Sequence, residues 1–407
     1  LINGTSKLVE NIEVGDLLMG DDSSPRCVLS LARGRDKMYS VTNVKGETYT
    51  VNQEHILCLK MSGYPNIYRN HGKVNTNFCI RWLENNVFCY KTFTYKKDSS
   101  DLEKQQKNAE MFYKQICETA ITNSNILEIS VKDYLTLSNK LKSQLKGYKV
   151  GIDFEHKEVP FDPYMIGYWI GDGTSRSTSI TTQDSQVLYY FYQHLSQYGL
   201  HLVHAGKYSY SIQTFDKMKC RQNKMTQVLN DLNLKNNKHI PDIYKYNSRE
   251  VRLQVLAGLL DSDGHLNRNI FEFTQKNEKM MDDVLFLCRS LGFACYKHPK
   301  KTSWVYHNVK NTGTAFRINI SGENIDKIPT KILRKQAPIR RQLKDVLVSG
   351  FTVEYVGEDD YYGFTVDKNH RYLLENFTVT HNSCSSIAIA EGMKETTKQI
   401  FVMTPAS

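Results

Sequence analysis

The chain has no run of eighteen apolar residues, which excludes a membrane-spanning helix. Its N-terminus lacks the basic stretch and apolar segment of a secretory signal. Its nine cysteines are scattered and include no C-x-x-C pair. That usage argues against a zinc site and a disulfide framework, and it fits a reducing compartment. We therefore expect an intracellular protein, in cytoplasm or nucleus, without a membrane partner.

Positively charged side chains are in moderate excess. The formal net charge is +10, and the 407 residues include 25 tyrosines and 17 phenylalanines. A basic, aromatic-rich surface is compatible with nucleic-acid binding, but a solubilising charge excess explains it equally well. The length is sufficient for two or three domains, each with its own core.

The order of patterns predicts an all-β domain interrupted by an α/β insert. Short strands separated by turns are expected at 17–20, 38–42 and 48–51, and again at 351–355 and 362–366. Residues 91–106 are polar and lysine-rich, which is typical of an exposed loop or insertion. The predicted division is 1–95 (β domain, first part), 96–155 (linker or inserted segment that contacts DNA), 156–340 (α/β insert, with halves 163–247 and 248–340), 341–382 (β domain, second part) and 383–407 (a separate tail).

The insert contains an internal repeat of three landmarks. In each copy an Asp-Gly pair is followed by an amphipathic helix ending in glycine, and then by an Ile-Pro pair. The first copy has Asp172-Gly173, Gly199 and Pro241, and the second has Asp263-Gly264, Gly292 and Pro329. Three landmarks in one order indicate a duplicated unit with a pseudo-twofold axis.

Each Asp-Gly pair follows a predicted helix. Pro163 suits the first position of one helix, and Ser248 suits the N-cap of the other. Small side chains repeat along one face of both helices, which allows the two backbones to approach closely; they are Gly167, Gly171, Ala257, Gly258 and Ser262. The glycine after each aspartate is expected to end the helix.

Two carboxylates at helix C-termini face the negative ends of the helix dipoles, at a cost of a few tenths to about 1 kcal/mol each. A divalent cation shared by Asp172 and Asp263 relieves this cost, and oxygen ligands favour Mg²⁺, with Mn²⁺ as the alternative. Such an ion activates water and stabilises charge on a phosphate. A lone Asp-Gly is ordinary turn chemistry, so the prediction depends on the repeat.

The segment Leu-Ala-Gly-Leu-Leu-Asp-Ser-Asp-Gly at 256–264 closely resembles the LAGLIDADG signature of homing endonucleases, and 165–173 resembles a degenerate copy. The resemblance implies that Asp172 and Asp263 are catalytic metal ligands, with Gly171 and Ser262 at the metal site. It also implies catalytic lysines at Lys238 and at Lys327 or Lys331. That family cleaves both strands of long double-stranded DNA sites and binds them through β-sheet saddles, here 271–274 or 316–320.

The region before residue 383 carries separate chemistry. In His381-Asn382-Ser383 the Asn382 amide can attack its own main-chain carbonyl, His381 can donate a proton, and the Ser383 hydroxyl can accept an acyl group. Residues 361–382 resemble the C-terminal splicing block of inteins along their whole length, which implies that His370 assists this step.

Residues 1–5 and 14–16 resemble the N-terminal block of inteins. The segment 51–57 resembles the block whose histidine, here His55, activates the first scissile peptide. Three positions depart from the family pattern. The printed sequence opens at Leu1, where the family has a preceding Cys or Ser, so as printed we expect no N-terminal acyl shift. Asn52 replaces a threonine, and Gly363 replaces an aspartate.

The chain is thus similar to inteins, in which a Hint splicing domain, a horseshoe of β-strands, carries a LAGLIDADG endonuclease. We expect it to be monomeric, to need no cofactor for splicing, and to be flanked by extein segments. Residues 383–407 resemble the sequence after a Walker A lysine in P-loop helicase-type NTPases. A splicing element with an inactive endonuclease, a free-standing LAGLIDADG endonuclease and a host helicase remain as alternatives.

Overall fold

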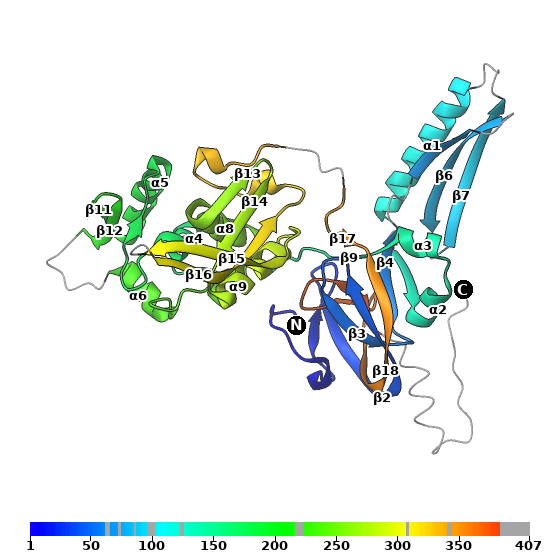
Figure 1. Cartoon of the computed structure of the whole chain (residues 1–407), viewed down its shortest axis with the longest axis horizontal. Coiled ribbons are helices and arrows are strands. Elements are labelled where there is room, and N and C mark those ends of the chain that lie inside the picture. Colours follow the sequence, from blue (N-terminus) through cyan, green and yellow to red (C-terminus); the bar gives the residue numbers. More distant parts are fainter. Residues whose placement is uncertain are drawn as a thin grey trace. The chain divides into compact units, whose positions relative to one another are not determined.

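The computed structural model describes residues 1–61, 66–71, 75–84, 87–96, 102–122, 126–215, 223–306, 309–339 and 344–382. The chain divides into two compact units (Figure 1). Unit 1 comprises Leu1–Lys149 and the chain from Val348 on, and unit 2 comprises Val150–Leu347. In the described part of the chain, no helix is both long enough and apolar enough to cross a membrane.

Unit 1 is built mainly from antiparallel strands. One sheet consists of β1 (Leu17–Met19), β2 (Pro25–Asn43), β3 (Thr48–Asn52) and β18 (Phe351–Val366). A second sheet has the order β17 (Val348–Ser349), β9 (Leu145–Tyr148), β4 (Ile56–Met61) and β8 (Ile126–Ser130). The remaining elements are η1 (Val9–Asn11), α2 (Val131–Thr136), α3 (Asn139–Gln144) and the pair β19 (Arg371–Leu373) and β20 (Val379–His381).

Strands β2 and β18 form a long antiparallel ribbon that joins the two sequence-distant parts of unit 1. Their pairing runs from Phe351 opposite Asn43 to Val366 opposite Val28. The two strands expected at 351–355 and 362–366 are therefore one continuous strand. A register shift between Tyr355 and Gly357, where Gly357 has φ +119°, lets the ribbon pass through the polar stretch between them.

Residues 96–155 are not simply a linker. Strands β8 and β9 pair with both edges of β4 and complete its sheet, because Leu127 and Leu145 bury their side chains in the same core as Leu57. The lysine-rich stretch 91–106 is also not one loop. Its first part belongs to a three-stranded sheet of β5 (Asn66–His71), β6 (Asn75–Glu84) and β7 (Val87–Lys96), and its last residues begin α1 (Leu102–Thr122), which covers that sheet (Figure 1).

Unit 2 contains two helix-and-sheet regions in succession. The first has α4 (Pro163–Asp172), β10 (Ile180–Thr181), α5 (Ser185–Leu195), η2 (Ser196–Tyr198), β11 (Leu200–His204), β12 (Ser209–Thr214), α6 (Lys224–Asp231) and α7 (Asp242–Lys245). The second has α8 (Arg249–Asp263), β13 (Gly264–Asn267), β14 (Ile270–Gln275), α9 (Glu278–Ser290), β15 (Lys297–Tyr306), β16 (Val309–Ile320), η3 (Ile325–Lys327) and η4 (Leu333–Lys335). The sheets have the orders β10-β12-β11 and β13-β14-β16-β15.

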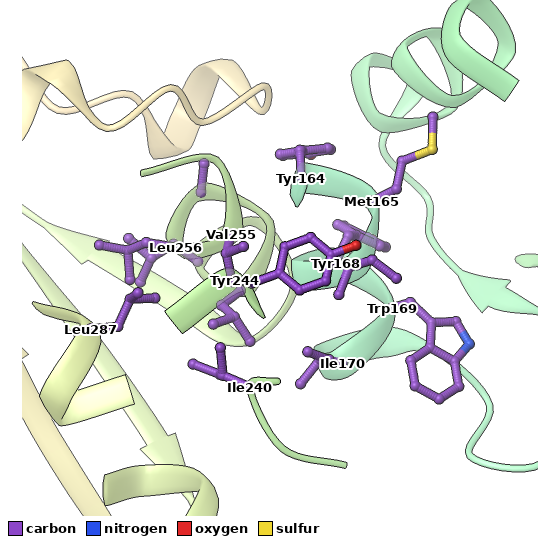
Figure 2. Close-up of a cluster of buried hydrophobic side chains, with 14 of the residues drawn as sticks. Tyr164, Met165, Tyr168, Trp169, Ile170, Ile240, Tyr244, Val255, Leu256 and Leu287 are labelled. Carbon is purple, nitrogen blue, oxygen red and sulfur yellow. The ribbon is translucent and has the colours of Figure 1, made fainter. Parts of the chain in front are cut away.

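Helices α4 and α8 pack directly against each other through the predicted small residues. A Cβ atom on Gly167 would overlap the main-chain oxygen of Val255, and one on Gly258 would overlap that of Tyr164. A Cβ atom on Gly171 would overlap the Ser262 hydroxyl. Figure 2 shows the large apolar side chains of both helices around this contact, all of them buried, including Tyr168, Trp169, Ile170, Val255 and Leu256.

The helix ends agree with the expected positions but differ in their chemistry. Asp162 caps α4 by accepting a hydrogen bond from the Met165 N–H at 2.9 Å, with Pro163 in the first turn. Ser248 precedes α8 without a side-chain capping bond. Gly173 and Gly264 are extended rather than left-handed, with φ −82° and −81°. Glycine is needed there because a Cβ would collide with the oxygens of Trp169 and Leu260.

Replacing Gly258 with alanine should destabilise unit 2 by about 3 kcal/mol, because a methyl group must push the two helix backbones apart. Hydrogen exchange of the α4 and α8 amides, followed by mass spectrometry, measures the loss. Gly206→Ala is the matched control, since its Cβ would meet only Ser209 at 3.9 Å. Equal protection in the two variants would contradict this account of the helix contact.

Candidate splicing and nuclease sites

Strand β20 brings His381 to the main-chain carbonyl of Asn382. The Nδ1 atom of His381 lies 2.6 Å from the Asn382 carbonyl oxygen. Because that oxygen can only accept, the ring must carry its proton on Nδ1. This contact polarises the carbonyl group whose peptide bond the sequence predicts to be cut. The contact is already formed in this structure.

Asn382 is buried, and its side-chain oxygen has no hydrogen-bond partner among the described residues. Its main-chain N–H donates to the carbonyl oxygen of His370 at 3.1 Å. A buried amide with an unused acceptor is held less firmly than one with all partners. The main chain of Asn382 thus has a hydrogen bond that its side-chain oxygen lacks within the described residues.

His370 supports this arrangement through its backbone more than through its ring. It adopts a left-handed conformation, with φ +61°, and its Nδ1 donates to the Val366 oxygen at 2.6 Å. The exposed ring lies 5.5 Å from that of His381, centroid to centroid. The structure thus brings the predicted His370, His381 and Asn382 together.

His55 is buried and engages the same C-terminal segment. Its Nε2 lies 2.6 Å from the Thr380 hydroxyl oxygen. Burial lowers the pKa of His55 to about 3, and the neighbouring His381 acts in the same direction. Near pH 7 this ring is therefore neutral, and it can act there as a hydrogen-bond donor or a base rather than as a cation.

A cavity of about 620 Å³ lies beside His55 and Asn382, and its lining also includes Asn52, Gly363 and Thr380. Asn52 donates to the Asp36 carboxylate at 3.1 Å, which gives the residue in the threonine position a structural partner. Gly363 faces the cavity opposite Ala32 of β2, and so contributes no proton-carrying side chain there.

The first residue packs near one wall of this cavity. Leu1 contacts the buried cluster around Val28 and Phe364, which Tyr372 also contacts. Phe364 and Tyr372 both line the cavity. Ser383, the predicted acyl acceptor, lies outside the described residues, as does the whole segment 383–407.

In unit 2, Asp172 and Asp263 end the two packed helices. The Asp263 carboxylate lies 3.5 Å from where a Cβ of Gly171 would be, so the helix ends are close together. Burial raises the pKa of Asp172, and the charge of Asp263 raises it further. Loss of solvent also raises the pKa of Asp263. Neither carboxylate forms a hydrogen bond or an ion pair within the part of the chain that the structure describes.

Two lysines close the carbonyl ends of these helices. The Lys238 ammonium donates to the main-chain oxygens of Gly171 at 3.0 Å and Gly173 at 2.7 Å. The Lys335 ammonium donates to those of Leu260 at 2.9 Å, Asp261 at 2.7 Å and Ser262 at 3.2 Å. Burial lowers the pKa of both lysines.

Lys335, and not Lys327, is thus the second-half counterpart of Lys238. Lys327 is exposed and pairs with its neighbour Asp326 at 3.6 Å, and Lys331 lies over the rings of Tyr164 and Tyr190. Alignment of the two halves on their Ile-Pro pairs points to the wrong lysine. The lysine that contacts the end of α8 comes six residues after Pro329. A lysine search limited to the proline motif could not find it.

The residues at the helix ends fit a hard divalent cation. In the described ranges, no group of three or more His, Cys, Asp or Glu side chains is arranged so that it could hold a metal ion. A site here would have two carboxylates, main-chain oxygens and water. Mg²⁺ accepts such a set, since it retains several waters and takes one or two carboxylates. The oxygens of Gly171 and Ser262 already accept from lysines, so the carboxylates are the principal ligands available.

A sequence family described as Hom_end-associated Hint matches residues 1–381. The chain belongs to this family. The match begins at the first residue and ends at His381, so it includes His55, His370 and His381 of unit 1 and the paired helices of unit 2, and it stops one residue before Asn382.

Three curated relatives of this Hint chain are similar at 20–28% identity. The replicative DNA helicase DnaB of Mycobacterium intracellulare is 28% identical over 41% of this chain and 25% of its own length. The catalytic subunit of the V-type proton ATPase of Candida tropicalis is 22% identical over 94% and 42%. The homothallic switching endonuclease of Saccharomyces cerevisiae is 20% identical over 98% and 80%. The chain thus spans less than half of the first two relatives.

Acid should destabilise unit 1 through His55. Its folded pKa of about 3 lies below the unfolded value, so the unfolded chain binds a proton first as the pH falls below about 6.5. Between pH 6.5 and 4 this one group should cost up to about 1.4 kcal/mol per pH unit. Urea denaturation at several pH values should show a shallower dependence in His55→Gln. Equal slopes would mean that His55 titrates normally.

Proposed function

We propose that this Hint chain is an intein that combines autocatalytic protein splicing in unit 1 with site-specific cleavage of double-stranded DNA in unit 2. The observation that carries the splicing half is the hydrogen bond from His381 Nδ1 to the Asn382 carbonyl oxygen. The observation that carries the nuclease half is the pairing of Asp172 and Asp263 at the ends of two helices in contact. Membership of the family and the names of the relatives support both halves.

The splicing chemistry follows from the buried site. Asn382 Nδ2 bonds to its own main-chain carbonyl carbon, and the bond from that carbon to the next nitrogen breaks. Nδ2 loses one proton and the leaving nitrogen gains one, so the proton count balances. His381 withdraws electrons from the carbonyl oxygen throughout. The products are a cyclic imide at residue 382 and a free amino group on the following segment.

The position of His55 suggests one contribution to splicing. Its ring is held by Thr380, two residues before the cleaved bond, and it faces the cavity that Asn382 also lines. A neutral imidazole there can donate a hydrogen bond to a junction peptide in the cavity without carrying a buried charge. We propose that the upstream junction occupies this cavity, with Leu1 packed beside its wall.

In unit 2 we propose that Asp172 and Asp263 hold Mg²⁺ or Mn²⁺, with Gly171 and Ser262 beside it. Such an ion supplies an activated water and charge stabilisation at a phosphate. Lys238 and Lys335 fix the carbonyl ends of the helices, which orients the aspartates, and place two positive charges near the scissile phosphates. The proposal includes a pseudo-twofold relation between the two halves and a horseshoe arrangement of the strands of unit 1.

The sheet β13-β14-β16-β15 offers a surface for DNA. Alternation along β14 and β16 buries Phe271, Phe273, Ile318 and Ile320 against the helices. The intervening side chains leave the other face polar, and Arg317 and Lys300 lie there around Glu272 at 3.6 and 3.2 Å. A basic, polar face of this kind suits phosphate contacts and base readout. We propose that it binds the DNA target, as the segments 271–274 and 316–320 suggested.

The partners proposed for the whole chain are double-stranded DNA and the extein segments that flank residues 1–382. A host of the P-loop helicase type and an intracellular location agree with the tail sequence and with the relatives' names. We propose that the chain acts as a monomer, because both aspartates of the nuclease site come from one copy.

Splicing should depend on Asn382. With a cysteine placed before Leu1 and short flanking segments, the precursor should release ligated flanks, which intact-mass spectrometry detects. Asn382→Ala should block release after residue 382, because alanine has no amide to attack the carbonyl. Asn376→Ala is the control, since the Asn376 side-chain oxygen accepts a local hydrogen bond from the Thr378 N–H at 3.0 Å. Ligation that persists in Asn382→Ala would exclude the cyclisation.

DNA cleavage should depend on Asp263. Asp263→Asn should reduce Mg²⁺-dependent cleavage by at least about a thousandfold, because an amide is a poor ligand for a hard cation, while splicing continues. A plasmid library with random inserts identifies cleaved sites.

Lys327→Met should cleave as the parent does, whereas Lys335→Met should be impaired. An inactive parent chain would instead indicate a splicing element with a decayed nuclease.

A further inference from the structure

The Glu128 carboxylate, which has no role in the splicing chemistry proposed above, lies near the His381 ring nitrogen that does not contact Asn382. Glu128 stands on β8, between Leu127, which is buried in the core under β4, and Ile129. Alternation along the strand turns Glu128 to the opposite face, where β19 and β20 run. Its Oε2 lies 3.9 Å from His381 Nε2.

The position of Glu128 is fixed from a second side. Arg371 lies directly opposite His381 in the β19–β20 pair. Its Nε and Nη2 both reach Oε1 of Glu128, at 2.7 and 2.6 Å. Its Nη1 also lies 3.5 Å from Asp21. One carboxylate oxygen is therefore held by the guanidinium, and the other faces the imidazole.

We infer that Glu128 is a positioning residue for cleavage after Asn382: its carboxylate stabilises the protonated ring of His381, whose opposite nitrogen polarises the Asn382 carbonyl. The ring has one nitrogen for each partner, Nδ1 for the carbonyl at 2.6 Å and Nε2 for the carboxylate. A proton on Nε2 makes the Nδ1–H a stronger donor, because the ring is then cationic. This inference rests on the proposed splicing function.

The charges around His381 set its protonation in opposite directions. Burial lowers the pKa of His381, and His370 and Arg371 act with it, while the Asn382 carbonyl and Glu128 act against it. Asp21 faces Arg371 and so weakens the cation's effect. On the other side His55 is neutral near pH 7. Glu128 is thus the anion that favours the charged ring, and its removal should shift the protonation of His381 to lower pH.

The test follows release of the segment after Asn382 from the full chain, by mass spectrometry, between pH 5 and 9. Glu128→Gln should cut the rate by about tenfold at pH 7.5 and lower the midpoint of the pH profile by about one unit, since one unit is a factor of ten. Below both midpoints the rates should converge. Glu354→Gln, which removes an exposed charge from β18, should match the parent.

A purely structural role gives a different result. A rate lowered equally at every pH, or unchanged at every pH, overturns the inference. Glu128→Asp keeps the charge and should restore most of the profile if the glutamine variant folds poorly. In an Asn382→Ala background, which cannot cleave, NMR titration should show a lower His381 pKa with Glu128→Gln than without it, and equal values again overturn the inference. A parent chain that releases nothing refutes the proposed splicing function instead, so the two failures are distinguishable.

Discussion

The backbone contact between α4 and α8 places Asp172 and Asp263 close together in unit 2. Gly167, Gly171 and Gly258 leave no space for a side chain at the crossing, so the two helices approach as closely as backbones can. Both helices end in aspartate on the same side. Their like charges are brought together by packing energy from a large apolar core, not by any attraction of their own. Burial raises the pKa of Asp172, and the charge of Asp263 raises it further. Lys238 and Lys335 donate to main-chain oxygens at the negative ends of the helix dipoles.

In unit 1, hydrogen bonds hold the residues of the candidate splicing site in place. The peptide proposed to react lies at the end of β20, where the ladder with β19 holds His381 and the hydrogen bond to His370 holds the Asn382 backbone. The Asn382 side-chain oxygen is left without a partner among the described residues. For the proposed cleavage this means that His381 holds the Asn382 carbonyl, while the side-chain oxygen of the attacking amide has no hydrogen-bond partner in the described part of the chain. Burial of His55 keeps a further charge out of this cavity.

Sequence was sufficient where the signal is local. Helix geometry predicts the proline at the start of α4, the Asp-Gly pairs at the helix ends and the small residues, and the structure has them at these places. Glycines after α5 and α9 adopt positive φ, as helix-ending glycines often do. The resemblance of whole segments to inteins indicates the family, and the family match covers residues 1–381. Composition and charge alone could not indicate it.

Sequence was insufficient where a contact depends on strand pairing or on the length of a returning loop. Lys335 lies at the end of η4, where its ammonium group donates to the last carbonyl oxygens of α8. The Ile-Pro motif instead points to Lys327, eight residues earlier in the chain. Strands β8 and β9 have no feature that links them to β4, since the partners are far apart in sequence. Glu128 was missed for the same reason: nothing near it in the chain suggests His381. The extended Gly173 and Gly264 show that a glycine can be required by crowding as well as by handedness.

The pairing of β9 with β17 has an evolutionary meaning. Tyr148 lies opposite Val348, and Gly147 opposite Ser349, so the chain leaves unit 1 and re-enters it on adjacent strands. A tight turn of a few residues would bridge the same gap at little entropic cost. An ancestor could therefore acquire the intervening two hundred or so residues, or a descendant discard them, as a single cassette without re-pairing any other strand.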